Sequence, residues 1–143
     1  MRCAECGAHL PGEETCLDRF HAILEADYRG VPEAFAAHGL VVFTYHAQHP
    51  SRVKPWLRAA HRAGMRQIFG RGRDWRVVLA ENRRPGVVDR LKPASMADET
   101  PVVGGPIVGE LTIAGFDPAI PPGHVARVEA WARSVAEHRF LNR

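Results

Sequence analysis

The stretch Glu33-Ala-Phe-Ala-Ala-His-Gly-Leu-Val-Val-Phe-Thr-Tyr-His-Ala-Gln48 decides the fold, because it is apolar on nearly every side. A helix that is apolar all round is usually buried at the centre of a domain. Residues 40–45 also have the composition of a buried strand, since they are rich in residues that favour strands. We expect a helix over residues 33–48, because the pattern continues back to Ala34 without a turn signal and His49-Pro50 ends it.

Patterns on both sides of this stretch predict further helices. Upstream, Thr15 with Asp18 three residues later is a variant of the capping box, and predicts a helix over residues 16–27. Downstream, Pro55 suits the first turn of a helix and Gly70 its end. A short helix is expected over residues 75–82, and a last one after Gly123. The inner faces expected for the third and last helices are Trp56, Ala60, Gly64 and Ile68, and Val125, Val128, Ala132 and Val135, with Trp131 beside them.

A long stretch rich in proline and glycine separates the last two helices, over residues 85–123. A brief extended piece at residues 110–113 is the regular structure that we expect within it. A loop of this length in a small domain suggests a lid, a wrapped segment or a flexible arm. The sequence therefore predicts an all-α fold: a single helical domain over residues 1–143, built as a compact bundle of four to five helices.

Composition excludes some classes of protein. Of the 143 residues 45% are hydrophobic, which is enough for a core, and the formal net charge is only +3. This charge is too small to indicate a nucleic-acid-binding protein by itself. We find no signal peptide and no segment long and apolar enough to span a membrane. We therefore expect a cytoplasmic protein, in which cysteines stay reduced and act as thiolates or metal ligands.

The three cysteines predict a zinc site near the start of the chain. Cys3 and Cys6 have the Cys-x-x-Cys spacing with which two thiolates bind one tetrahedral ion from a tight turn, and Gly7 lets that turn curl. A redox dithiol is less consistent with the sequence, because no strand precedes the pair. Cys16 lies at the first turn of the predicted helix, where the helix dipole favours a thiolate. We expect it to be a third ligand rather than a buried structural cysteine.

The fourth ligand is expected to be a histidine that the fold brings back to the sulfurs. If residues 16–27 and 33–48 form an antiparallel helical hairpin, the end of the second helix lies beside Cys16. His49 is then the first candidate and His46 the second. His21 points about 140° away from Cys16 around a helix axis, and His9 lies in the turn, so both rank lower.

A second candidate site is a pocket on the inner side of the predicted bundle. His38 and His61 are expected to face inward, and a buried imidazole needs a hydrogen-bond partner. Tyr45 or Gln48 is placed to supply one. The sequence thus suggests a possible pocket lined by His38, Tyr45, Gln48 and His61.

Three motifs stand out along the chain: Cys-x-x-Cys-Gly at residues 3–7, Tyr-x-x-Gln-His-Pro at residues 45–50 and Trp-Ala-Arg-Ser-Val at residues 131–135. Together they resemble an uncharacterised bacterial family of domains of unknown function, DUF5946, and the resemblance covers most of the chain. It implies a compact helical fold without an established activity. It also places Cys3, Cys6, Cys16, His38, Gln48, His49 and His61 on shared positions.

Three functions follow as hypotheses. The first is a small zinc-binding protein whose Cys3, Cys6, Cys16 and His49 shell is structural, because four closed ligands leave no vacancy for substrate. The second is a zinc-dependent enzyme, hydrolase-like or lyase-like, with an open metal position or with chemistry in the histidine pocket. The third is a nucleic-acid-binding zinc knuckle, in which Trp75 and the arginines of residues 71–76 contact bases, and this is the least expected. We expect the partner to be a small molecule or a protein, and not a membrane.

Overall fold

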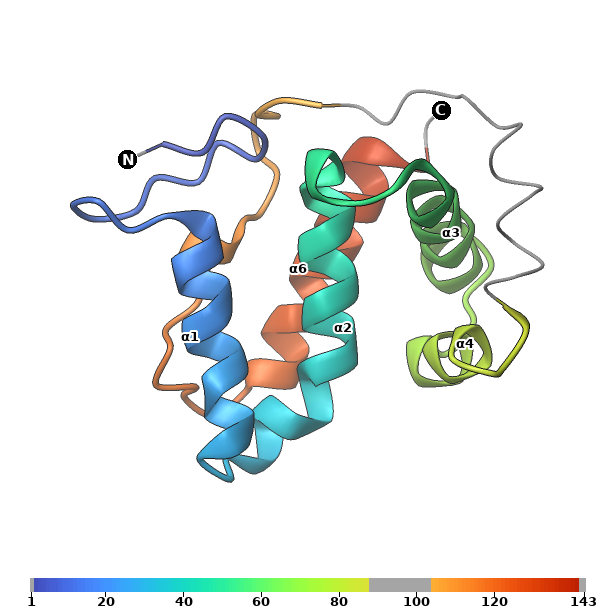
Figure 1. Cartoon of the computed structure of the whole chain (residues 1–143), viewed down its shortest axis with the longest axis horizontal. Helices are drawn as coiled ribbons and strands as arrows, with labels where there is room; N and C mark the ends of the chain where they lie inside the picture. Colours follow the sequence, from blue (N-terminus) through green and yellow to red (C-terminus); the bar gives the residue numbers. More distant parts are fainter. Residues whose placement is uncertain (1, 88–103, 142–143) are drawn as a thin grey trace.

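The structure is a computed structural model that describes residues 2–87 and 104–141. This part of the chain contains five α-helices and no β-strand, which confirms the predicted all-α fold (Figure 1). The helices are α1 (Cys16–Tyr28), α2 (Pro32–Gln48), α3 (Pro55–Met65), α4 (Trp75–Asn82) and α6 (His124–Arg139). None of the helices in the described residues has the length and apolarity that crossing a bilayer requires.

Helix α2 forms the centre of the molecule, as its composition predicts. It packs most extensively against α6 and also contacts α1, α3 and α4 (Figure 1). Leu40, Val41 and Tyr45 are almost completely buried on it. The helix forms in preference to the alternative strand because, once neighbours surround α2 on several sides, burial outweighs the strand propensity of residues 40–45. Phe35 is an exception, since it is 76% exposed near the start of the helix.

Local signals fix the first helical hairpin. The Thr15 side chain accepts a hydrogen bond from Asp18 N at 3.1 Å, and Thr15 N donates to Asp18 Oδ2 at 2.9 Å, so the predicted capping box is present. At the other end of α1, Gly30 takes a left-handed backbone with φ of 75°. The chain then turns back, and α2 runs antiparallel to α1 (Figure 1). This arrangement returns the end of α2 to the level of Cys16.

Helix α3 begins at Pro55 as expected but ends differently. After Met65 the chain continues as a π-helical turn, Arg66–Gly70. Gly64 and Ile68 are buried as predicted, whereas Trp56 and Ala60 are only half-buried. At Gly64 a Cβ atom would lie 2.7 Å from Cζ of Phe43 on α2, so the absence of a side chain lets the two helices approach closely.

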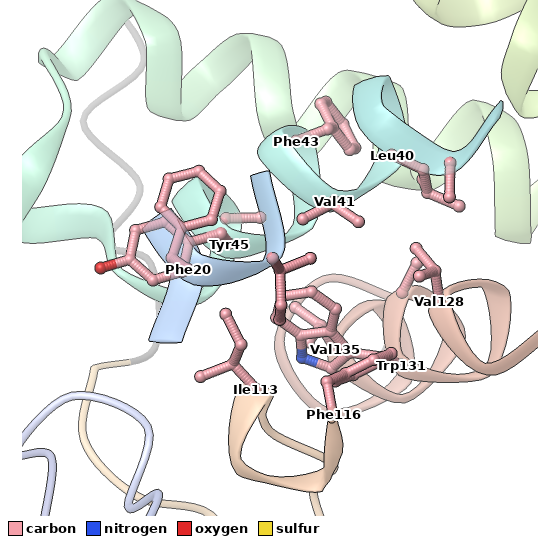
Figure 2. Close-up of a cluster of buried hydrophobic side chains, with 14 of the residues drawn as sticks. Phe20, Leu40, Val41, Phe43, Tyr45, Ile113, Phe116, Val128, Trp131 and Val135 are labelled. Atoms are coloured by element: carbon pink, nitrogen blue, oxygen red, sulfur yellow. The ribbon is translucent and has the colours of Figure 1, made fainter. Parts of the chain in front are cut away.

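The described segment before α6 packs against α1 and α6. Thr112 is extended as expected, but the next residue begins a 3-10 turn, Ile113–Gly115. Ile113 and Phe116 insert from this turn against Trp131 and Val135 of α6 (Figure 2). Residues 88–103 of the predicted loop lie outside the described residues. The described part of the loop thus supplies core side chains.

Candidate metal centre

A tight turn at the N-terminus holds Cys3 and Cys6. Gly7 N donates to Cys3 O and Cys3 N donates to Ala8 O, both at 2.9 Å, which closes the turn on itself. Gly7 has a φ of 79°, and a Cβ atom there would lie 2.8 Å from Cβ of Pro106, so glycine is required both for the turn and for the contact. Ala8 N lies 3.4 Å from Cys6 Sγ and donates to it. A backbone N–H aimed at sulfur stabilises a thiolate.

Cys16 brings the third sulfur from the first turn of α1. Its Sγ lies 3.5 Å from Sγ of Cys6. A disulfide would require about 2.05 Å, and all three cysteines are free. Two sulfurs that each lie about 2.3 Å from one tetrahedral ion are separated by a little under about 4 Å. The observed separation therefore suits two ligands of one ion.

His49 completes the group from the end of α2. Its Nδ1 lies 2.7 Å from the carbonyl oxygen of Tyr45, which makes Nδ1 the protonated ring nitrogen. Its Nε2 is buried and has no hydrogen-bond partner among the described residues. One ligand atom each from Cys3, Cys6, Cys16 and His49 all lie within 4.8 Å of one another. The free lone pair of Nε2 is thus available to a metal ion, and the backbone hydrogen bond orients the ring for it.

An aromatic stack supports these two helical ligands. Phe20 lies one turn after Cys16 on α1, and Tyr45 lies one turn before His49 on α2. The Phe20 and Tyr45 rings stack with centroids 3.9 Å apart, and the Tyr45 ring stacks on His49 at 4.2 Å. Figure 2 shows the Phe20 and Tyr45 side chains next to each other. The stack thus packs the helical turn that follows Cys16 against the one that precedes His49.

The thiols perturb one another strongly. The hydrogen bond from Cys16 is the largest effect that lowers the pKa of the Cys6 thiol, which falls to about 4 despite burial. The same hydrogen bond and burial raise the pKa of the Cys16 thiol. Ionisation of the Cys6 thiol therefore disfavours ionisation of the Cys16 thiol. A divalent cation between them would stabilise both as thiolates.

The other candidate histidines lie outside this cluster. His9 and His21 are exposed. His46 turns toward α3, where its ring is parallel to that of His61 with centroids 6.3 Å apart. His38 is paired with Asp27 at the end of α1. Of the expected ligands, the structure brings together Cys3, Cys6, Cys16 and His49.

The structure divides the second candidate site into two places. His38 and His61 line a groove between α2, α3 and α4, but Tyr45 and Gln48 are not part of its lining. The Tyr45 ring lies in the stack beneath the metal centre. The Gln48 side chain points toward α6, where it accepts a hydrogen bond from Trp131 Nε1 at 3.1 Å. The pocket of four residues suggested by the sequence is therefore not formed as a unit.

Sequence reasoning missed a buried polar network next to the cluster. Gln48 Nε2 donates to Glu110 Oε1 at 2.8 Å, and Arg139 pairs with the same carboxylate. Arg139 also donates to the backbone oxygen of Glu5, within the cysteine turn, at 3.3 Å. A signal for this network was present in Glu110, a lone acid between Gly109 and the apolar Leu111. The network ties the turn to the end of α6.

The residues proposed to contact nucleic acid are arranged differently from a base-binding surface. Trp75 is only 8% exposed, its Nε1 donates to Glu129 at 3.2 Å, and the Arg76 guanidinium covers its ring at 4.4 Å from the centroid. Arg73 is paired with Glu81 at 2.8 Å. Base stacking requires an accessible aromatic face. Trp75 does not present one.

Comparisons with curated proteins and with solved structures find no match. One family does match: its profile covers residues 1–139, and so includes the cysteine turn, all five described helices and the network at the end of α6. The activity of that family has not been determined, so membership describes ancestry and not chemistry. The chain belongs to the family of unknown function DUF5946.

Proposed function

We propose that the protein binds one zinc ion through Cys3, Cys6, Cys16 and His49, and that this ion is structural. The observation that carries the proposal is the state of His49. Its Nε2 is buried without a hydrogen-bond partner among the described residues and faces three sulfurs at ligand separation. An orphaned buried nitrogen costs about 1–3 kcal/mol, and a metal ion in the middle of the group removes that cost.

The donor set favours zinc over other common ions. Three thiolates and one imidazole form one of the usual tetrahedral zinc shells. Calcium and magnesium prefer oxygen ligands, and this group of four contains sulfur and nitrogen donors but no carboxylate. A cytoplasmic location is part of the proposal, because a reducing compartment keeps the three thiols available.

The ion would act mainly on folding. It joins three segments: the N-terminal turn with Cys3 and Cys6, the start of α1 with Cys16, and the end of α2 with His49. The described residues before Cys16 form no α-helix, so binding energy becomes folding energy for residues 2–16. The ion would thereby fix the hairpin of α1 and α2, on which α6 and α3 pack.

The enzymatic alternative depends on the number of protein ligands. A hollow of about 180 Å³ lies beside the cluster and includes Cys3, Cys16 and His49 in its lining. Zinc enzymes hold their ion with three protein ligands and one water. A shell of four protein ligands leaves no place for that water. A direct count of ligands therefore separates the two functions.

The test is metal analysis together with cobalt substitution. Protein purified without added metal is expected to contain about one zinc per chain, and its Co²⁺ form to show tetrahedral d–d bands with thiolate charge-transfer bands for three sulfurs. Cys16→Ser should lower both metal content and thermal stability. His21→Ala, which changes an exposed histidine on the same helix, is the control and should retain the metal. A wild-type protein that is fully folded without metal would contradict the proposal. A Co²⁺ spectrum typical of a five-coordinate or water-ligated ion would favour the enzymatic alternative.

A further inference from the structure

A groove lies between α2, α3 and α4, on the far side of α2 from the metal centre. Its volume is about 500 Å³, which is within the range of small-ligand sites in proteins. The walls are mainly apolar: Val42 and Phe43 from α2, Trp56, Leu57 and Ala60 from α3, and Leu79 from α4. The groove shares no lining residue with the metal cluster, so it is an independent site.

The described residues that line the groove carry charge of one sign. They include Arg83, at the end of α4, and no aspartate or glutamate. The Arg83 guanidinium makes no ion pair or hydrogen bond with any other part of the chain that the structure describes. An apolar groove with one unpaired cation at its edge favours a ligand that is apolar over most of its length and carries a single negative charge.

Gly39 fixes where that cation lies. A Cβ atom at Gly39 would lie 2.5 Å from Arg83 Nη2. The guanidinium therefore rests directly on the backbone of α2, in a space that any larger residue would fill. His38, which precedes Gly39, also lines the groove, and its Nδ1 is paired with Asp27. The Arg83 guanidinium and His38 thus both lie beside Gly39 in the lining of the groove.

His61 gives the wall of the groove a polar atom. This residue is 5% exposed, and its Nδ1 has no hydrogen-bond partner among the described residues. Its ring stands edge-on to Phe43 with centroids 5.1 Å apart. Burial, with a smaller effect of His46, lowers the pKa of His61 to about 4, so its imidazole is neutral near pH 7. A neutral imidazole adds a hydrogen-bonding group to the site without adding charge.

We propose that this groove binds a small apolar carboxylic acid. The carboxylate pairs with Arg83 at the rim, and the aromatic or aliphatic body lies against Val42, Phe43 and Leu57. A carboxylate suits the site better than a phosphate ester, because the described lining offers one cationic donor group, Arg83, whereas a doubly charged phosphate usually requires more donors. The proposal does not depend on the zinc site.

The test uses two probes of nearly the same shape, 4-phenylbutyrate and its uncharged amide, titrated into the full-length protein. Binding is read from the NMR signals of the Trp56 indole and the His61 ring, which line the groove. The acid is expected to saturate these shifts at submillimolar to low-millimolar concentration. The amide should bind up to roughly fivefold more weakly, the effect of one ion pair at an exposed arginine.

Two arginine variants separate the proposed contact from general charge. Arg83→Met should weaken the acid to the level of the amide and leave the amide unchanged. Arg84→Met removes the neighbouring exposed arginine, which does not line the groove, and should leave both probes unchanged. Ala60→Phe, which fills the groove, should abolish both shifts. Equal affinity for acid and amide, equal effects of the two arginine variants, or no saturable shift with the acid would each overturn the proposal.

Discussion

Glu110 and Arg139 form a doubly hydrogen-bonded ion pair that is completely shielded from solvent. Arg139 Nε donates to Glu110 Oε2 at 2.6 Å and Nη2 donates to Oε1 at 2.7 Å, and both side chains have 0% exposure. Gln48 and the backbone oxygen of Gly105 occupy further positions around the pair. The network joins α2, α6 and the segment before α6, so it connects parts of the chain that are distant in sequence.

Removing one partner of this pair should be costly. Glu110→Gln leaves the Arg139 charge buried and uncompensated, and we expect a loss of about 3–5 kcal/mol in the free energy of unfolding. The double variant Glu110→Gln, Arg139→Met should lose less than the sum of the two single variants. The exposed pair Arg73 and Glu81 is the control, and Glu81→Gln should have little measurable effect. Urea denaturation measures all four, and additive losses would show that the two groups act independently.

Metal removal should destabilise the protein and act first on its N-terminal part. At a free zinc concentration about a thousand times the dissociation constant, the ion contributes about 4 kcal/mol to stability. A chelator should therefore lower the melting temperature. In hydrogen exchange, residues 2–16 should lose protection, whereas the α2–α6 contact should keep most of it. A uniform loss of protection from hydrogen exchange across α6 would instead mean that the ion stabilises all the helices together.

Gly64→Ala should destabilise the contact between α2 and α3. The added Cβ would lie 2.7 Å from Cζ and 3.2 Å from Cε2 of Phe43. We expect a net loss of about 1–2 kcal/mol, since overpacking costs about 1–3 kcal/mol and alanine returns up to about 1 kcal/mol of helix propensity. The double variant Gly64→Ala, Phe43→Leu should recover part of the stability that Gly64→Ala loses. Gly115→Ala, where a Cβ meets nothing within 4 Å, is the matched control for thermal denaturation.

Acid should destabilise the protein through His61. Burial lowers the pKa of this imidazole from 6.5 to about 4, so between these two pH values the unfolded chain binds a proton that the folded chain does not. The contribution of the neutral His61 imidazole to the free energy of unfolding is fully present above pH 6.5. It decreases as the pH falls toward 4, by at most about 3 kcal/mol. His61→Gln should flatten this part of the curve of unfolding free energy against pH. His46, which faces His61 from α2, is present in both proteins, and identical slopes would contradict the prediction.

The parts of the fold that depend on local chemistry could be predicted from the sequence. Thr15 and Asp18 determine where α1 begins, because a capping box needs only neighbours in the chain. Helix α4 has the bounds expected for residues 75–82. The π-helical end of α3 could not be predicted, since Gly70 marks a stop but not the extra residue that widens the last turn.

Of the two candidate sites, the metal cluster could be predicted from the sequence and the composition of the pocket could not. The turn at Gly30 and the antiparallel hairpin bring His49 to Cys16, and both follow from helix lengths. Tyr45 was expected in a pocket with His38, because a buried imidazole needs a hydrogen-bond partner and helical spacing puts the two residues on one face of α2. That face has different neighbours along its length: α4 and the end of α1 near His38, and Phe20 near Tyr45. Periodicity gives the face of a helix but not what lies opposite it.

The four proposed ligands all occur within the first 49 residues, whereas Glu110 and Arg139 come from the last third of the chain. A ribosome releases the N-terminal part of a chain first. The ion can therefore bind the α1–α2 hairpin while α6 is still being synthesised. Its cysteine ligands would then be coordinated before Arg139, which contacts their turn, has been added to the chain. Pulsed hydrogen exchange during refolding would show this order as protection of α1 and α2 ahead of α6 in the presence of zinc and simultaneous protection in its absence.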